Sequence, residues 1–135
     1  MAGPVSAESQ RQMAPLRGLV PIAHVADVQR SIDFYRQLGF REGHTLVVEG
    51  RLVWAWLANG IAHLMVGRCA PSANLEDVVF YLYAQDVVAY HDELEAKGVK
   101  VSAIGHPPYM QAGEFCVTDP DGYCLLIGQA DQDPI

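Results

Sequence analysis

The sequence predicts an α+β domain in which two β-α-β-β-β modules form a curved mixed sheet. A helix signal occurs twice, at residues 27–39 and again 59 residues later at 86–98. In both copies an aspartate can accept hydrogen bonds from the first free backbone N–H groups, and a glycine can take the left-handed conformation that ends a helix. An apolar, β-branched segment precedes each helix, at 19–25 and at 78–83. An internal period of this kind indicates two copies of one structural unit.

The first module is expected to span residues 18–70, after a flexible lead at 1–17 that shows no periodicity. Its helix has one apolar face, because four side chains recur at helical spacing: Val28, Ile32, Tyr35 and Leu38. Three strands are expected to follow this helix, at about 42–48, 51–57 and 61–67. The dipeptides Glu49-Gly50 and Asn59-Gly60 between them favour hairpin turns.

The second module is expected to span 76–130 and to repeat this plan, with a short tail at 131–135. Its predicted elements are a strand at 77–84, a helix at 87–97, a short strand at 99–104, and hairpin strands at 114–118 and 123–128. The hairpin turns at Asp119-Pro120-Asp121-Gly122, residues that favour a type I turn. The segment 105–113 is too rich in proline and glycine for regular structure, and loops of this kind often cover a site.

Length and composition indicate one globular domain. Of the 135 residues, 50% are apolar and 19% are charged. No apolar run reaches the roughly 18 residues that span a bilayer, and the N-terminus lacks the basic-then-apolar order of a signal peptide. We therefore expect a cytoplasmic protein without a membrane partner. The net charge of −7 argues against a nucleic-acid partner, whose phosphates require clustered Lys and Arg.

The three cysteines, Cys69, Cys116 and Cys124, have neither metal-binding nor redox spacing. They are expected to be reduced, partly buried thiols. Cys116 and Cys124 are expected to face each other across the predicted hairpin, which would permit a pair under oxidation.

The double module resembles the vicinal oxygen chelate superfamily, also called the glyoxalase/bleomycin-resistance/dioxygenase family. The similarity covers about residues 18–130 and rests on four segments: VADVQRSIDFY at 25–35, LGF at 38–40, GEF at 113–115 and DPDGY at 119–123. The family includes metal-dependent lyases, isomerases, epimerases and dioxygenases as well as metal-free drug-binding proteins. Members of the bleomycin-resistance branch are homodimers in which the halves of two chains often complete each cavity. The resemblance therefore implies a symmetric homodimer.

Enzymes of this family hold a divalent ion with four side chains from the first and last strands of each half. The resemblance places these positions at Val20, His63, Val79 (or Phe80) and Leu126, of which only His63 can offer a lone pair. Zn²⁺, Fe²⁺ or Mn²⁺ typically needs three or more N or O protein ligands. We therefore expect no metal, no cofactor and none of the family's Lewis-acid chemistry, and we assign no catalytic residue.

A non-standard metal site is the alternative, because strand alternation directs His24 and His63 toward the same cavity. Glu114 or Cys124 could supply a third donor. A site of this kind would make the protein a metal-dependent lyase, isomerase or dioxygenase.

The same alternation predicts an apolar and aromatic cavity with a few polar tips, which is typical of a pocket for a flat organic molecule. Its rings can stack on an aromatic ligand or meet a cation, its methionine gives an adaptable wall, and its carboxylate could meet a cationic group. Ordinary core packing is the alternative for the aliphatic members, and a helix or subunit contact for the tryptophans. For each histidine the alternative is a polar group satisfied by a neighbour, and for Glu114 it is an exposed carboxylate at the end of a strand. The candidate ligand-binding residues are His24, Trp54, Trp56, His63, Met65, Tyr81, Tyr83, Glu114, Cys124 and Leu126.

The leading hypothesis is therefore a metal-free small-molecule-binding protein that resembles bleomycin-resistance proteins. It would sequester a hydrophobic or cationic aromatic compound such as an antibiotic. The metal-dependent enzyme is the second hypothesis, and a structural or regulatory dimer with a collapsed cavity is the third. Metal content and ligand-induced thermal shifts distinguish the three.

Overall fold

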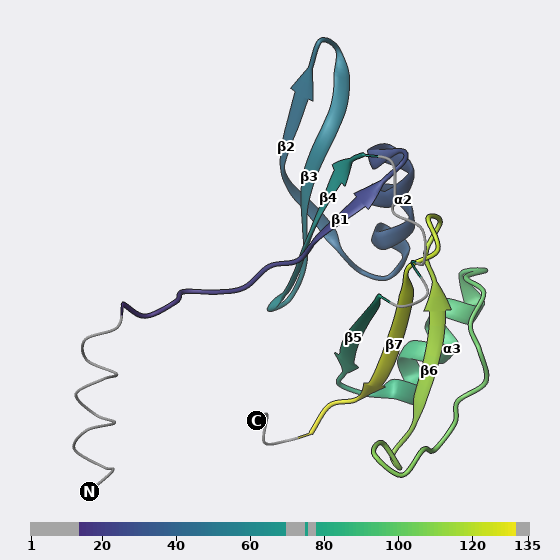
Figure 1. Cartoon of the computed structure of the whole chain (residues 1–135). Coiled ribbons are helices and arrows are strands. Elements are labelled where there is room, and N and C mark those ends of the chain that lie inside the picture. Colours follow the sequence, from purple (N-terminus) through teal and green to yellow (C-terminus); the bar gives the residue numbers. More distant parts are fainter. Residues whose placement is uncertain (1–13, 70–74, 76–77, 132–135) are drawn as a thin grey trace, which may run out of the picture.

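The computed structural model describes residues 14–69, 75 and 78–131, which form two β-sheets that each pack against one helix (Figure 1). Most of the predicted lead (1–13), most of the loop between the modules (70–74, 76–77) and most of the tail (132–135) lie outside the described residues. The first module contains β1 (Ile22–Val25), α2 (Val28–Gln37), β2 (Arg41–Val48), β3 (Arg51–Asn59) and β4 (Ala62–Arg68). The second contains β5 (Val79–Ala84), α3 (Val87–Ala96), β6 (Glu114–Thr118) and β7 (Cys124–Gln129).

Both sheets are mixed and share one plan. The first has the strand order β1-β4-β3-β2 and the second has the order β5-β7-β6. In each module the first strand pairs in parallel with the last, and the remaining pairs are antiparallel. The predicted α+β fold of two repeated modules is confirmed. Its strands are divided between two sheets, one in each module.

The ends of both helices are built as the repeat predicts. The side chain of Asp27 accepts a hydrogen bond from the N–H of Arg30 at 3.1 Å, and Asp86 accepts one from the N–H of Ala89 at 3.0 Å. Beyond the helices, Gly39 and Gly98 have φ values of 95° and 85°, in the left-handed region that glycine enters without steric cost. The two helix signals 59 residues apart therefore reflect the same pair of end structures, an aspartate that caps the start of the helix and a left-handed glycine just beyond its end.

Each sheet buries the face that its helix covers and leaves the other face open. Along β1, Ala23 and Val25 are buried while Ile22 and His24 are exposed. The same alternation separates Phe115 and Val117, which are buried, from Glu114 and its half-buried neighbours on β6. The buried side chains of both modules form one hydrophobic core. The open face is therefore the place where side chains are free to meet a ligand or a partner.

The predicted short strand at 99–104 is wrong, because this segment lies beside β6 without forming a regular ladder. The N–H of Ser102 donates to the carbonyl of Cys116 at 3.0 Å, but the N–H of Cys116 donates to the Ser102 hydroxyl at 2.8 Å. A serine side chain thus takes the place of a backbone acceptor. One isolated bridge, between Gly105 and Glu114, continues the contact.

Two segments project from the modules in Figure 1, the β2–β3 hairpin and the chain that precedes β1. Every residue of β2 is exposed, including Leu46, Val47 and Val48. Leu16 and Leu19 are 90% and 87% exposed. Apolar side chains in such positions are available to another surface.

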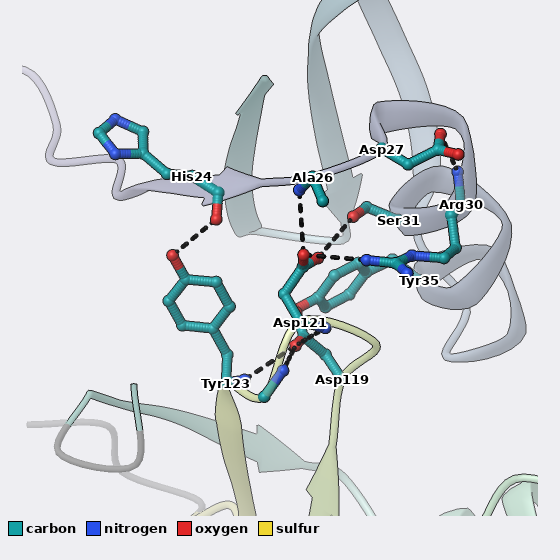
Figure 2. A network of polar contacts seen from close by, with 10 residues as sticks. His24, Ala26, Asp27, Arg30, Ser31, Tyr35, Asp119, Asp121 and Tyr123 are labelled. Carbon is teal, nitrogen blue, oxygen red and sulfur yellow. Dashed lines mark hydrogen bonds and ion pairs between the residues drawn. The ribbon is translucent and has the colours of Figure 1, made fainter. Parts of the chain in front are cut away.

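The turn at 119–122 joins the two modules through Asp119, as Figure 2 shows. This buried carboxylate accepts three backbone N–H hydrogen bonds, from Asp121, Gly122 and Tyr123, at 2.9 to 3.0 Å. Its other oxygen accepts a hydrogen bond from the Tyr35 hydroxyl of α2 at 2.8 Å. Burial raises the pKa of Tyr35 well above its ordinary value, and the neighbouring charge of Asp119 raises it further.

Asp121 of the same turn binds the start of α2. It accepts hydrogen bonds from the N–H of Ala26 at 3.0 Å and from the Arg30 guanidinium at 2.9 Å. The Tyr123 hydroxyl donates to the carbonyl of His24 at 2.8 Å, on the strand before the helix (Figure 2). The hairpin of the second module therefore fixes the position of α2 and β1 through directional polar contacts.

Candidate ligand-binding site

The first sheet presents five of the candidate residues on its open face. The register pairs Met65 with both Ile22 and Trp56, and His63 with Ala58, so these side chains share one side. Trp54 and His24 belong to the same side because each pairs with Gly67. The candidate residues on this face are His24, Trp54, Trp56, His63 and Met65.

The structure brings Trp56 and His63 into direct contact. The indole N–H of Trp56 donates to Nδ1 of His63 at 2.9 Å, and the two ring centroids are 5.5 Å apart. His24 does not join them, because its partner Gly67 lies four residues beyond His63 along β4, about 13 Å at the usual rise per residue. The two histidines of the alternative metal site are therefore separated within one chain.

The second sheet presents the other five candidates on its own open face. The register pairs Tyr81 with Leu126 and Tyr83 with Gly128, and it pairs Glu114 with Gly128. The Tyr81 and Tyr83 rings lie 5.0 Å apart, centroid to centroid. The candidate residues on this face are Tyr81, Tyr83, Glu114, Cys124 and Leu126.

Glu114 is the polar centre of this second face. One carboxylate oxygen accepts a hydrogen bond from the Tyr81 hydroxyl at 2.6 Å, and the other accepts one from the Tyr109 hydroxyl at 2.8 Å. Burial and the hydrogen bond with Glu114 raise the pKa of Tyr81, and the same carboxylate raises the pKa of Tyr109. Both phenols therefore stay protonated and orient the acid.

Two residues of this face were not among the candidate ligand-binding residues, although Cys116 was expected to face Cys124 and does so, with the two sulfur atoms 3.7 Å apart. Tyr109 belongs to the irregular segment at 105–113, which indicated a covering loop but not which side chain would reach the site. Cys116 follows Glu114 by two positions on β6, so alternation alone could have assigned it to the open face.

The described chain also has a groove of about 960 Å³ beside β5. Its lining comes from that edge strand, the first half of α3 and the turn that joins β3 to β4, and includes Ile61 and Tyr90. Of the candidate residues only Tyr81 and Tyr83 line it. This groove therefore reaches the second sheet's candidates Tyr81 and Tyr83 and none of the five candidates on the first sheet.

Comparison with known proteins identifies the family. The family model of the Glyoxalase/Bleomycin resistance protein/Dioxygenase superfamily matches residues 20–127. The chain belongs to this superfamily. The resemblance seen in the sequence is confirmed by this match. No match is found among the curated proteins.

Solved structures of the superfamily share this fold at low sequence identity. An antibiotic-binding protein, TnmS3 from Streptomyces sp. CB03234, is 21% identical with a TM-score of 0.70, and the match covers 89% of this chain and 100% of that one. The bleomycin-binding protein from Streptomyces verticillus, complexed with copper(II)-bleomycin, is 22% identical with a TM-score of 0.63 and coverages of 88% and 100%. A glyoxalase-related enzyme from Clostridium phytofermentans is 16% identical with a TM-score of 0.74 and coverages of 89% and 99%.

The side chains at the superfamily's metal-binding positions do not fit a divalent ion. Val79 and Leu126 lie on the open face of the second sheet and offer only hydrocarbon, as does Val20 before β1. His63 is the one donor, and its Nδ1 already accepts the hydrogen bond of Trp56. Metals of this class need several N or O ligands, so no chemical step is assigned to an ion here.

Among the described residues, one group of side chains is close enough together to hold an ion. It consists of His91, Asp92 and Glu95 of α3. It lies on the helix and away from both open faces. The two ring nitrogens of His91 lie 3.1 Å from an Asp92 carboxylate oxygen and 3.0 Å from the Ser102 carbonyl oxygen. Both ring nitrogens of His91 therefore have hydrogen-bond partners within the protein, and no ion is needed to explain the position of this side chain. Among the described residues, no helix is long and apolar enough to cross a membrane.

Proposed function

We propose that this protein is a small-molecule-binding member of the superfamily that sequesters a hydrophobic or cationic aromatic compound without a metal ion. The observation that carries the proposal is Glu114, whose carboxylate is held by Tyr81 and Tyr109 on an open sheet face. The Tyr83 ring lies beside that of Tyr81. A carboxylate framed by aromatic rings attracts an organic cation through its charge and through cation–π contact.

Two further observations support this function. Solved structures with the same fold include an antibiotic-binding protein and a bleomycin-binding protein. The first sheet supplies a second surface suited to a flat ligand, with the Trp54 and Trp56 side chains on one side of β3. The hydrocarbon at Val20, Val79 and Leu126 supports binding that does not depend on a metal.

We further propose that the protein is a homodimer in which each site combines the first sheet of one chain with the second sheet of the other. The candidate residues lie on the open faces of two separate sheets, and the groove beside β5 includes only Tyr81 and Tyr83 of them. Several exposed apolar side chains would be covered by such an arrangement, and their burial would stabilise it. They include Leu16, Leu19, Ile22, Leu46, Val47, Val48, Ile61, Val79 and Tyr83.

Thermal unfolding with bleomycin and a panel of aromatic antibiotics, with and without a chelator, tests the function. We expect at least one compound to raise the unfolding temperature equally in both conditions, because saturation at one hundred times Kd stabilises by about 2.7 kcal/mol. Glu114→Gln should weaken binding of a cationic compound about tenfold, since it removes the charge but keeps the shape.

Glu95→Gln is the matched control, because it makes the same change on the exposed side of α3. It should bind like the unchanged protein. A stabilising ligand that requires added metal, or one whose affinity is the same for Glu114→Gln, would contradict the proposal.

A further inference from the structure

Gly128 on β7 is a position where the open face of the second sheet is covered. Cys124 and Leu126, the neighbouring open-face residues of this strand, are half-buried, whereas Gly128 is buried. A Cβ atom at Gly128 would lie 2.5 Å from the Tyr81 hydroxyl oxygen and 2.9 Å from the Met110 methyl carbon. Both distances are shorter than the contacts that Cβ atoms make in proteins. Glycine at this position therefore makes room for two side chains.

The backbone does not require this glycine. Gly128 is a regular member of β7, and its φ lies outside the left-handed region that Gly39 and Gly98 occupy. Glycine weakens a strand, because it adds no side-chain packing and loses more conformational freedom on folding than other residues. Inside a strand it often marks the close approach of another group. The approach of Tyr81 and Met110 therefore accounts for the glycine here.

The two side chains come from the segments that hold Glu114. Tyr81 donates to one carboxylate oxygen at 2.6 Å, and Tyr109, the residue before Met110, donates to the other at 2.8 Å. Met110 is fixed relative to Tyr109, because its N–H and its carbonyl both form backbone hydrogen bonds inside the segment 105–113, at 2.9 and 3.1 Å. A displacement of either side chain from Gly128 would therefore loosen a hydrogen bond to Glu114.

The covered position gives the face a closed end and an open end. The ladder places Glu114 opposite Gly128, and the next open-face pair is Cys116 with Leu126. The face is closed at Gly128, whereas Cys116, Cys124 and Leu126 are half-buried and offer an apolar surface. A ligand whose cationic group meets Glu114 therefore extends its body over these three side chains.

We propose that Gly128 is a positioning residue of this site, and that the site takes compounds with a cationic group at one end of a flat apolar body. Because Gly128 has no side chain, both phenols reach Glu114 and the segment 105–113 closes this end of the face. The ligand class rests on the proposed binding function, whereas the positioning of the tyrosines does not.

Gly128→Ala in the ligand-free protein tests the positioning. The new methyl group should push the Tyr81 hydroxyl away from Glu114. The pKa of Tyr81, which burial and this hydrogen bond raise, should then fall toward its ordinary value. NMR of tyrosine labelled at Cζ measures the ionisation, and Tyr81→Phe assigns the signal. Gly43→Ala is the matched control, because a Cβ atom there would lie 3.6 Å from its nearest neighbour, an ordinary contact. It should leave the signal unchanged.

A double-mutant cycle decides the question even if Gly128→Ala folds poorly. In the Tyr81→Phe background the hydroxyl that meets the new methyl group is absent. Gly128→Ala should therefore lower the unfolding temperature less than it does in the unchanged protein. An equal decrease in both backgrounds, or a pKa of Tyr81 that does not fall, would overturn the positioning role.

Binding of two fluorescent probes tests the ligand class. Pyrenylmethylammonium has a cation at one end of a flat body, and pyrenylmethanol has the same body without the charge. Gly128→Ala should weaken binding of the cation about fivefold, the loss expected for one hydrogen bond, and leave binding of the neutral probe unchanged. Leu126→Ala should weaken binding of both probes, because it removes apolar contact with the body. Gly43→Ala should weaken neither.

Equal binding of the cation by Gly128→Ala, Leu126→Ala and the unchanged protein would overturn the assigned orientation of the ligand. If the unchanged protein binds neither probe, the ligand class is refuted together with the proposed function. The cycle with Tyr81→Phe contains no ligand, so it still decides the role of Gly128 in that case.

Discussion

At the scale of single residues, Asp119 both closes the turn of the last hairpin and joins that turn to α2. Its buried carboxylate accepts hydrogen bonds from three backbone N–H groups and from the Tyr35 hydroxyl. Burial raises the pKa of Asp119 above its ordinary value, and the hydrogen bonds from the Tyr123 N–H and the Tyr35 hydroxyl offset only part of this rise. The acid is tolerated in the core because nearly every lone pair has a partner.

Asp119→Ala is expected to lower the free energy of unfolding by about 3 kcal/mol or more, because it leaves several buried donors without an acceptor. Tyr35→Phe should cost only about 1–2 kcal/mol, because it removes one hydrogen bond. Urea denaturation followed by circular dichroism measures both. Asp33→Asn, an exposed change on the same helix, should stay within about 0.5 kcal/mol of the unchanged protein. Equal losses in all three variants would refute the assigned role of Asp119.

The sequence predicted the local role of these aspartates but not the contacts that they make with distant parts of the chain. Asp27 and Asp86 were expected to cap helices, and they do, because capping depends on residues three positions away. Asp119 and Asp121 were predicted only as turn residues. Their partners Tyr35 and Ala26 lie 84 and 95 positions earlier in the chain, so no local pattern could indicate the contact.

At the scale of elements, strand alternation predicted which side chains share a face of a sheet. The strand predicted at 99–104 did not form, because a side-chain hydrogen bond replaces part of its ladder. The faces of β1 and β7 follow from the period of two, which the burial of alternate residues enforces, and the face of β5 follows from its parallel register with β7. The segment 99–104 has a strand-like composition. It fails as a strand because the hydroxyl of Ser102 bonds the N–H that a ladder would have used. A propensity count cannot anticipate that exchange.

The β2–β3 hairpin is the element on which we expect dimer formation to depend. Leu46→Lys combined with Val48→Lys should weaken the dimer at least tenfold, because two charges would replace exposed apolar side chains at the contact. The unfolding temperature of the dilute protein should hardly change, since neither residue is buried in one chain. Sedimentation equilibrium over a range of concentrations measures the effect.

Ala103→Lys, on the exposed segment before β6, adds charge away from the hairpin and should leave association intact. A monomeric unchanged protein, or a hairpin variant that dimerises normally, would exclude this arrangement.

At the scale of the whole molecule, the candidate residues separate into an indole-rich face on the first sheet and a tyrosine-carboxylate face on the second. The sequence predicted the members of both faces but pooled them in one cavity. Alternation within strands contains no information on how two sheets are oriented. The distances that decide this are tertiary, and here the two faces belong to separate sheets.

Mixing two binding-deficient variants tests whether one site takes a face from each chain. Trp56→Ala and Glu114→Gln should each bind a cationic aromatic ligand weakly as homodimers. After the two are unfolded and refolded together, half of the dimers are mixed, and each mixed dimer contains one unaltered site. Calorimetry should then recover about one quarter of the original sites. A site contained in one chain would recover none, which would refute the shared arrangement.

The turn that holds Tyr35 and Ala26 also imposes an order of events on folding. Its contacts close loops of 84 and 95 residues. Such contacts form late in folding, because the chain loses the conformational entropy of the loop before the new contacts contribute any favourable free energy. During synthesis, α2 therefore emerges from the ribosome long before Asp119 and Asp121 exist. Until the last hairpin is made, the first module carries an unpaired tyrosine and an unanchored helix, and this interval is where chaperones have most reason to bind.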